Sequence, residues 1–149
     1  LKYKKKINLV LVGSIKDRVY YKKILKFIEI NRLKKNIKIL KFVSLKKLIQ
    51  LYDHSKGLLY ASSSGPENLP PLEAFARGKN VIVSDYPGSK EQLNKFATYF
   101  NLKQKKNVEE KILNFKKFNS KDLKNYARLK SADNYIKNLL KKVERDFNV

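Results

Sequence analysis

The sequence predicts an α/β fold, a doubly wound parallel sheet covered by helices on both faces. From residue 7 to residue 100, short apolar runs rich in β-branched residues alternate with longer segments of helical spacing. Such alternation is typical of parallel strands joined by crossover helices. Glycine, proline and serine stand at the ends of the runs, where turns are expected. With 149 residues, 42% of them hydrophobic, the chain is long enough for one domain with a buried core over residues 1–149.

In the first third of the chain, we expect strands at 7–12 and 37–43 and helices at 16–33 and 45–53. The apolar residues of the first helix share a face opposite its lysines: Tyr20, Ile24, Phe27 and Ile28. Ser44 is a natural N-cap for the second helix. His54 directly follows that helix, and we interpret it as exposed and structural.

A strand, loop, helix and strand follow at the centre of the chain. The strands are expected at 57–61 and 80–84, and the helix begins at Pro70-Pro71 and ends near Gly78. Beyond them the spacing predicts a short helix at 90–95, a strand at 97–100, a helix at 108–117 and one long C-terminal helix at 121–147. Because a sheet of this kind often has one more βα unit in front, we expect the first βα unit to be missing.

The loop and helix at 62–78 concentrate the chemistry of the chain. Ligands of parallel sheets lie beyond the carboxyl ends of the strands, where a helix N-terminus suits phosphate. Gly65 allows close approach of a ligand to the backbone. Glu73 is predicted in the first turn of the helix, where its two oxygens suit a vicinal diol. The alternative is that Glu73 only complements the helix dipole.

Composition excludes several kinds of site. The chain has no cysteine, so disulfides and thiolate metal sites are absent, and the single His54 cannot make a zinc site. We therefore expect no metal. No apolar run approaches the ~20 residues that span a bilayer, and no signal peptide is visible, which favours a cytoplasmic location. A chain without Met that begins at Leu1 is expected to be a piece of a longer product or a trimmed chain.

The formal net charge of +22 leaves two interpretations open. Nearly all of the excess is lysine, spread along the chain, whereas arginine is the residue that reads phosphate and base edges bidentately. This distribution is typical of a genome-wide bias toward Lys and Asn codons on solvated faces. The other interpretation is a basic patch that faces an anionic membrane, where each lysine contributes ~1 kcal/mol. No specific nucleic-acid partner is expected.

The segment 69–78, Leu-Pro-Pro-Leu-Glu-Ala-Phe-Ala-Arg-Gly, is followed by Val81-Ile82-Val83-Ser84-Asp85 and by Gly88-Ser89-Lys90-Glu91. These motifs resemble the C-terminal domain of GT-B retaining glycosyltransferases, more narrowly glycosyltransferase family four, the glycosyl transferases group one. The resemblance covers most of the chain, and it implies a Rossmann-like domain that binds the donor nucleotide.

The resemblance also implies roles for individual residues. Glu73 is similar to the second Glu of the family's paired-Glu motif, which holds the ribose hydroxyls. Asn68 and Leu69 resemble the loop whose amides hold the donor sugar and phosphate. The other donor-binding candidates are Gly13, which keeps the cleft open, and Val43 and Ser44, which end the strand against which the base lies.

Two departures from the family pattern affect these roles. The family's first Glu falls at Gly65 here, so the candidate catalytic residue becomes Glu67. Either Glu67 reaches the donor sugar by another loop path, or that contact is absent. The Arg and Lys that neutralise the donor diphosphate belong upstream of Gly13, and Lys4, Lys5 and Lys6 do not lie in that context.

Taken together, the resemblance implies the donor-binding half of a retaining glycosyltransferase of bacterial surface polysaccharide or lipopolysaccharide synthesis, of hexosyltransferase type. Its donor would be a UDP- or GDP-sugar with no further cofactor. Its partner would be an N-terminal acceptor-binding domain, to which the long final helix crosses back, and the isolated half would be inactive. Two alternatives remain: a non-catalytic basic α/β module that binds nucleic acid or an anionic membrane, and a transferase remnant that binds nothing.

Overall fold

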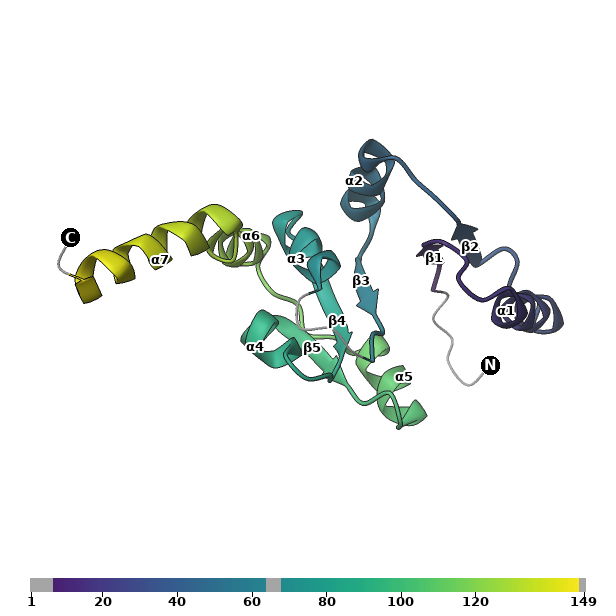
Figure 1. Ribbon diagram of the computed structural model, residues 1–149. Helices are drawn as coiled ribbons and strands as arrows, with labels where there is room; N and C mark the ends of the chain where they lie inside the picture. Colours follow the sequence, from purple (N-terminus) through teal and green to yellow (C-terminus); the bar gives the residue numbers. More distant parts are fainter. Residues whose placement is uncertain (1–6, 64–67, 148–149) are drawn as a thin grey trace. The chain divides into compact units, whose positions relative to one another are not determined.

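The computed structural model describes residues 7–63 and 68–147 (Figure 1). The chain divides into two compact units, Leu1–Leu48 and Ile49–Val149, and each is described by itself. The expectation of a single domain over 1–149 stays a prediction.

The first unit contains a two-stranded parallel ladder and one helix. Strand β1 (Leu9–Val12) pairs in parallel with β2 (Ile37–Leu40), with Leu9 opposite Ile37. Between them lies α1 (Arg18–Ile30), which begins after Asp17, whose carboxylate accepts from the backbone N–H of Val19 at 2.8 Å. The predicted strand at 37–43 is three residues too long, because the four residues of β1 offer pairing partners only as far as Leu40.

The predicted apolar face of α1 is only partly buried. Ile28 is 6% exposed, whereas Tyr20 and Phe27 are 63% and 59% exposed. Tyr20 and Phe27, which the spacing places on the same face as Ile28, therefore remain exposed. A ladder of two strands is too narrow to cover a wide helical face.

Helix α2 (Leu45–His54) follows Ser44, whose hydroxyl accepts from the backbone N–H of Lys47 at 3.3 Å, as predicted for an N-cap. Tyr52 is buried, at 9% exposure. His54 is the last residue of the helix and is exposed, also as predicted.

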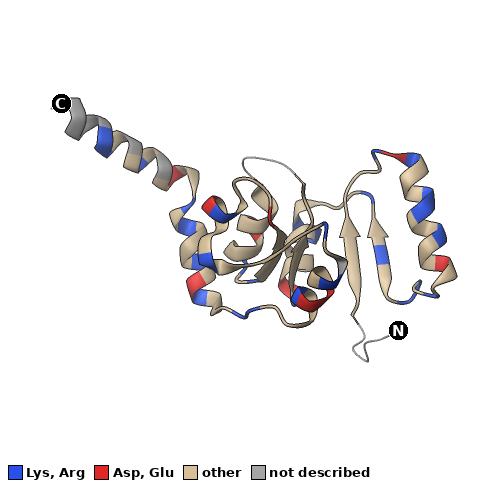
Figure 2. Cartoon of the chain, turned by 90° about the horizontal axis from the view of Figure 1, so that it is seen from below, with Lys and Arg blue, Asp and Glu red and all other residues tan. Residues whose placement is uncertain are grey.

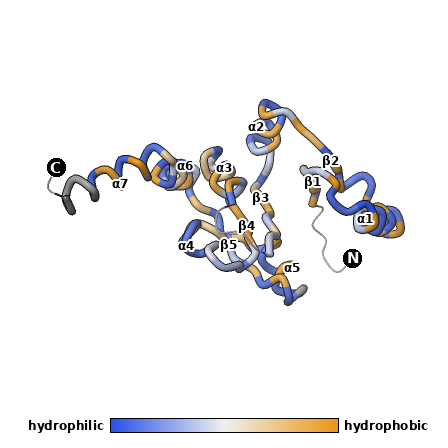
Figure 3. Tube along the Cα trace, in the orientation of Figure 1, coloured by the Kyte–Doolittle hydropathy of each residue, from blue (hydrophilic) through white to orange (hydrophobic). Residues whose placement is uncertain are grey.

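The second unit is built on a three-stranded parallel ladder in the order β3-β4-β5 (Figure 1). Strand β3 (Gly57–Tyr60) pairs with the central strand β4 (Asn80–Ser84), which pairs with β5 (Ala97–Phe100). Residues 81–84 of β4 are buried, and Figure 3 shows β4 in the hydrophobic colours. All ladders are parallel, so the predicted α/β class is confirmed.

The helices of the second unit bury an aromatic core against this ladder. Helix α3 (Leu69–Ala76) packs on β3 and β4 and against α6 (Ser120–Leu129). Phe75 of α3 is fully buried and meets Tyr126 of α6 edge to face, with ring centroids 6.0 Å apart. Two further helices and a 3₁₀ turn complete this part of the unit: α4 (Ser89–Leu93), η1 (Asn94–Phe96) and α5 (Lys105–Leu113).

The C-terminal helix predicted at 121–147 is two helices in the structure. Helix α6 ends at Leu129, and α7 (Ala132–Phe147) begins after two intervening residues. The side chain of Asn134 donates to the carbonyl of Arg128, and the hydroxyl of Ser131 accepts from the backbone N–H of Asn134 at 3.4 Å. These short polar side chains satisfy helix-end groups locally, and therefore interrupt a helix that the apolar spacing alone would continue.

Candidate functional site

The start of α3 lies at the carboxyl edge of the β3-β4-β5 ladder. Tyr60 is the last residue of β3 and leads into the connection to α3, and Ser84 is the last residue of β4. The hydroxyl of Ser84 contacts the carbonyl of Ser62, which joins the ends of the two strands at this edge. Open parallel sheets bind their ligands at such an edge.

Asn68 precedes α3 with the extended backbone of an N-cap, at φ −118° and ψ 111°. Its side-chain oxygen accepts from the hydroxyl of Tyr60 at 2.6 Å, and the side chain does not cap the helix. The side-chain amide of Gln92 meets both backbone groups of Asn68: Oε1 accepts from its N–H at 3.4 Å, and Nε2 donates to its carbonyl at 3.1 Å. The first residue of the site is thus held from β3 and from α4.

Pro70 and Pro71 lie in the first turn of α3. Neither has a backbone N–H, so this helix start offers fewer donors to an anion than an ordinary one. The expectation that free N–H groups here bind phosphate is therefore weakened. Leu69, also in the first turn, is 64% exposed and keeps its own N–H.

Glu73 is the fifth residue of α3, and the first turn of the helix contains no acidic residue. The predicted placement in the first turn is wrong: the helix begins at Leu69, one residue before Pro70, so Glu73 falls on the second turn. Since the dipole effect falls off within the first turn, the interpretation of Glu73 as a dipole partner loses support. The side chain is exposed, and its Oε2 accepts from the hydroxyl of Tyr52 at 3.0 Å.

Tyr52 comes from the last turn of α2. Its hydroxyl also lies 3.4 Å from the carbonyl of Pro70. Burial raises the pKa of Tyr52 above its ordinary value, and the hydrogen bond and negative charge of Glu73 raise it further. The hydroxyl therefore stays protonated at neutral pH and donates to the carboxylate.

Two more tyrosines place their hydroxyls near Asn68. Tyr60 donates to it, as described, and Tyr86 follows β4 and is 4% exposed. Burial raises the pKa of Tyr86, while the Asn68 side chain favours its ionised form and Tyr60 opposes it. The edge of the ladder thus gathers the hydroxyls of Tyr60 and Tyr86 around the side-chain amide of Asn68.

The turn after β4 carries the Gly88-Ser89 pair of the predicted motif. Gly88 has φ +85°, a left-handed conformation that glycine adopts without strain. Ser89 is fully buried, and its hydroxyl accepts from the N–H of Tyr86 at 3.3 Å. This turn fixes Tyr86 beside the start of α3.

The predicted site residues fall into two groups. Asn68, Leu69 and Glu73 lie in the second unit, at the N-cap, the first and the fifth residue of α3. Gly13, Val43 and Ser44 belong to the first unit. Gly13 directly follows β1. Val43 and Ser44 lie in the connection from β2 to α2. The prediction that they end the strand against which the base lies is therefore wrong about the strand, which ends at Leu40. Gly65 and Glu67 lie outside the described residues.

Sequence reasoning missed two residues that hold this site, Tyr52 and Gln92. No role was predicted for Tyr52. The available signal was its hydroxyl, since a tyrosine at a buried position usually has a hydrogen-bond partner. Gln92 offered no local signal.

Over residues 7–63 and 68–147, no group of three His, Cys, Asp or Glu side chains could hold a metal ion. Within the same part of the chain, no helix combines the length and apolar character that crossing a membrane requires.

The parallel α/β arrangement is similar to the GT-B glycosyltransferase fold. A solved structure of sucrose-phosphate synthase from Thermosynechococcus elongatus matches 94% of this chain and 38% of its own length, with a TM-score of 0.67 and 16% identity. At that identity the likeness shows the fold alone.

The chain belongs to the family of glycosyl transferases group 1, whose model matches residues 1–138. It is 33% identical over 107 residues to the O-antigen chain mannosyltransferase RfbU of Salmonella typhimurium strain LT2. That match covers 72% of this chain and 30% of RfbU, so the chain spans about a third of the length of this relative.

Proposed function

We propose that this chain is the nucleotide-sugar-binding half of a retaining glycosyltransferase that acts in bacterial surface polysaccharide or lipopolysaccharide synthesis. Membership of the glycosyl transferases group 1 supports a transferase, and the likeness to an O-antigen chain mannosyltransferase supports a hexosyl donor. One observation carries the assignment of the site. The exposed carboxylate of Glu73, on the second turn of α3, has its Oε2 held by Tyr52; among the described residues, Oε1 makes no hydrogen bond.

In this proposal Glu73 accepts hydrogen bonds from the two ribose hydroxyls of a UDP- or GDP-sugar. Asn68 and Leu69 contact the donor sugar and phosphate, and Glu67 is the proposed catalytic residue. Catalysis then depends on electrostatic stabilisation of the leaving diphosphate. Because Pro70 and Pro71 remove backbone donors from α3, most of that stabilisation has to come from side chains outside this helix.

The proposed partner is an acceptor-binding domain elsewhere in a longer enzyme. The chain covers 30% of RfbU and 38% of the sucrose-phosphate synthase chain, as expected for one half of a two-domain protein. The isolated chain would bind the donor without transferring sugar. We place the enzyme in the cytoplasm, at the inner membrane.

Calorimetric titration with UDP and GDP tests the role of Glu73. Glu73→Gln keeps the size of the side chain and removes its charge, and we expect affinity to fall about tenfold, the order of one charge-assisted hydrogen-bonded pair. Glu110→Gln, at an exposed position of α5, is the matched control and should leave affinity unchanged. The ribose role is wrong if Glu73→Ala or Glu73→Gln binds both nucleotides within twofold of the parent chain.

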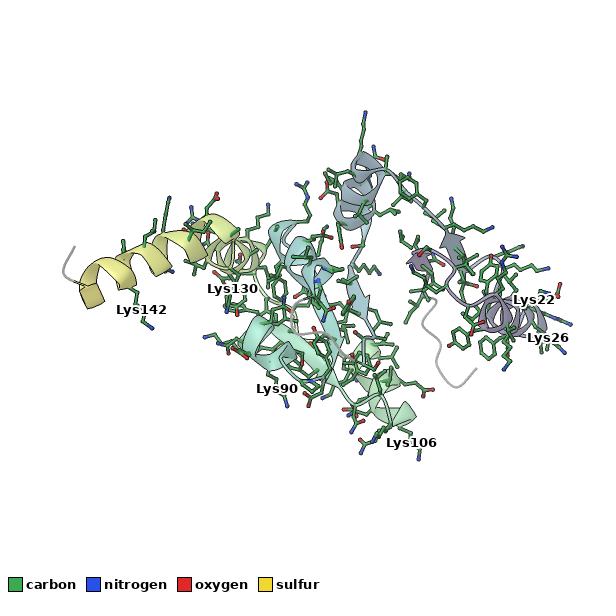
Figure 4. All side chains as sticks on the ribbon, viewed as in Figure 1. Lys22, Lys26, Lys90, Lys106, Lys130 and Lys142 are labelled. Carbon is green, nitrogen blue, oxygen red and sulfur yellow. The ribbon has the colours of Figure 1, made fainter. Side chains whose placement is uncertain are left out.

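The net charge of +22 supports a second candidate, a basic module that binds nucleic acid or an anionic membrane. Figure 2 shows Lys and Arg on helices throughout the described chain, and the six lysines labelled in Figure 4 come from α1, α4, α5, α7 and the link after α6. Gel-shift and vesicle-binding assays at two salt concentrations distinguish the candidates. Binding that persists near physiological salt favours the basic module, whereas binding lost steeply with salt is generic charge. A chain that no nucleoside diphosphate stabilises thermally would be a remnant that binds nothing.

A further inference from the structure

We infer that Tyr52 is a positioning residue, whose hydroxyl fixes the Glu73 carboxylate for the ribose diol and so sets a preference for ribonucleotides. The inference depends on the proposed function, because it assumes that Glu73 meets the ribose. It adds a second residue, from another helix, to that contact. Tyr52 would act through Glu73 without touching the nucleotide.

The contact joins a buried donor to an exposed acceptor. Tyr52 is 9% exposed, and its hydroxyl lies 3.0 Å from Oε2 of Glu73 and 3.4 Å from the carbonyl of Pro70. Glu73 itself is exposed. An exposed glutamate samples several rotamers, and ordering it on binding reduces affinity. Because the buried Tyr52 hydroxyl already holds Glu73 in one conformation, part of this ordering cost is removed before the ligand binds.

The last turn of α2 is itself anchored to α3, so the position of the hydroxyl does not depend on one flexible side chain. Asp53, next to Tyr52, accepts from Arg77 twice, from Nε at 2.8 Å and from Nη2 at 2.6 Å. Lys79 donates to the carbonyl of Asp53 at 2.7 Å. Glu73 and Arg77, the C-cap residue of α3, are four residues apart and therefore lie on the same side of this helix. Consecutive residues of α2 thus contact α3 one turn apart.

The chemistry of the pair suits a diol. The Tyr52 hydroxyl can only donate to an ionised carboxylate, and a carboxylate oxygen retains further lone pairs for a ligand hydroxyl. Within residues 7–63 and 68–147, Oε1 makes no hydrogen bond that would compete with a ligand hydroxyl. Fixing Oε2 determines where Oε1 lies, so two neighbouring ribose hydroxyls meet two oxygens of defined position. A nucleotide without those hydroxyls gains nothing from this arrangement.

The test compares UDP and GDP with their 2′,3′-dideoxy counterparts by calorimetry. We expect Glu73→Gln to abolish most of the preference for the ribonucleotide. Tyr52→Phe, which removes only the hydroxyl, should reduce that preference about three- to tenfold and leave the affinity for the dideoxynucleotide within twofold. Tyr126→Phe is the matched control: it removes a hydroxyl that donates to the carbonyl of Gln92 at 2.9 Å, and it should keep the full preference.

The outcomes separate this inference from the function on which it depends. If Glu73→Gln abolishes the preference and Tyr52→Phe does not change it, the positioning role is overturned and the proposed function stands. If Tyr52→Phe weakens ribo- and dideoxynucleotide equally, the hydroxyl is only structural, and the inference is again overturned. If Glu73→Gln keeps the preference, or the parent chain binds neither nucleotide, both proposals fall. Circular dichroism spectra of all variants check that each is folded.

Discussion

Replacing Gly78 by alanine should destabilise the junction between α3 and α6. Gly78 follows the C-cap Arg77 at φ +67°, and its N–H donates to the carbonyl of Phe75 at 2.7 Å. The N–H of Lys79 donates to the carbonyl of Ala74 at 2.8 Å. These two bonds form a Schellman motif, which ends α3 at the predicted glycine.

Two terms set the expected magnitude. A left-handed conformation costs an alanine about 1–2 kcal/mol. A Cβ at Gly78 would also lie 1.9 Å from the hydroxyl oxygen of Ser120, 3.0 Å from its Cβ and 3.2 Å from Cε of Lys124. Relieving such overlap costs about 1–3 kcal/mol. Alanine also lowers the conformational entropy of the unfolded chain, which offsets about 0.4–1 kcal/mol of this loss. The free energy of unfolding should therefore fall by about 2–4 kcal/mol, a large part of the stability of an ordinary domain.

Urea unfolding measures this change. The chain has no tryptophan, so far-ultraviolet circular dichroism and tyrosine fluorescence are the appropriate signals. Ser120→Ala is the matched background, because it removes the hydroxyl that the new Cβ would meet and keeps the rest of the side chain. In that background Gly78→Ala should cost about 1–2 kcal/mol less. A loss below about 0.5 kcal/mol, or an equal loss in both backgrounds, would refute the packing argument.

Three further outcomes follow from the described residues. Phe75→Leu should lower the free energy of unfolding by about 1–2 kcal/mol, and Phe75→Ala by about 3–5 kcal/mol, since the ring is fully buried against Tyr126; equal effects of the two variants in urea unfolding would contradict this. Arg77 lowers the pKa of Asp53, so this pair stabilises the fold above the unfolded pKa of an aspartate and loses its effect as pH falls through the lower folded value. The stability difference between the parent chain and Asp53→Asn should therefore be present at pH 7 and shrink below about pH 4 in thermal melts, and a difference independent of pH would count against the pair. Because lysines are spread over many elements, affinity for DNA in gel shifts should fall steeply between 50 and 200 mM salt, on the order of 10³-fold or more for six phosphate contacts, and a flat dependence would reveal a specific site.

Much of the local structure could be predicted from short-range patterns. Residues 80–84 were expected as a strand and form β4, and 45–53 were expected as a helix and form most of α2. The ends of elements were less predictable. Strand β2 ends at Leu40 because its partner β1 is short, and the helix predicted at 121–147 divides where Ser131 and Asn134 bind helix-end groups. Both limits depend on particular partners, which periodicity does not report.

The candidate site was predictable only in part. The motif around 69–78 singled out Asn68, Leu69 and Glu73, which the structure places at the N-cap and within the first five residues of α3. The turn on which Glu73 lies was wrong, because Leu69 and not Pro70 begins the helix. The assigned roles of Gly13, Val43 and Ser44 stay predictions.

By itself, the sequence determined the alternation of parallel strands and helices, the family motif and the acidic residue within it, because these are properties of residues close together in the chain. Only the tertiary structure decided what holds that acid. Tyr52 lies 21 residues before Glu73 and Asp53 lies 24 before Arg77, and these hydrogen bonds exist because the fold brings side chains of the last turn of α2 to α3 and its C-cap. Likewise, Ser120, 42 residues after Gly78, leaves no room for a side chain at position 78. The need for glycine at this position comes from the close packing of α3 against α6. A local sequence pattern does not show which distant side chain will lie against a given residue.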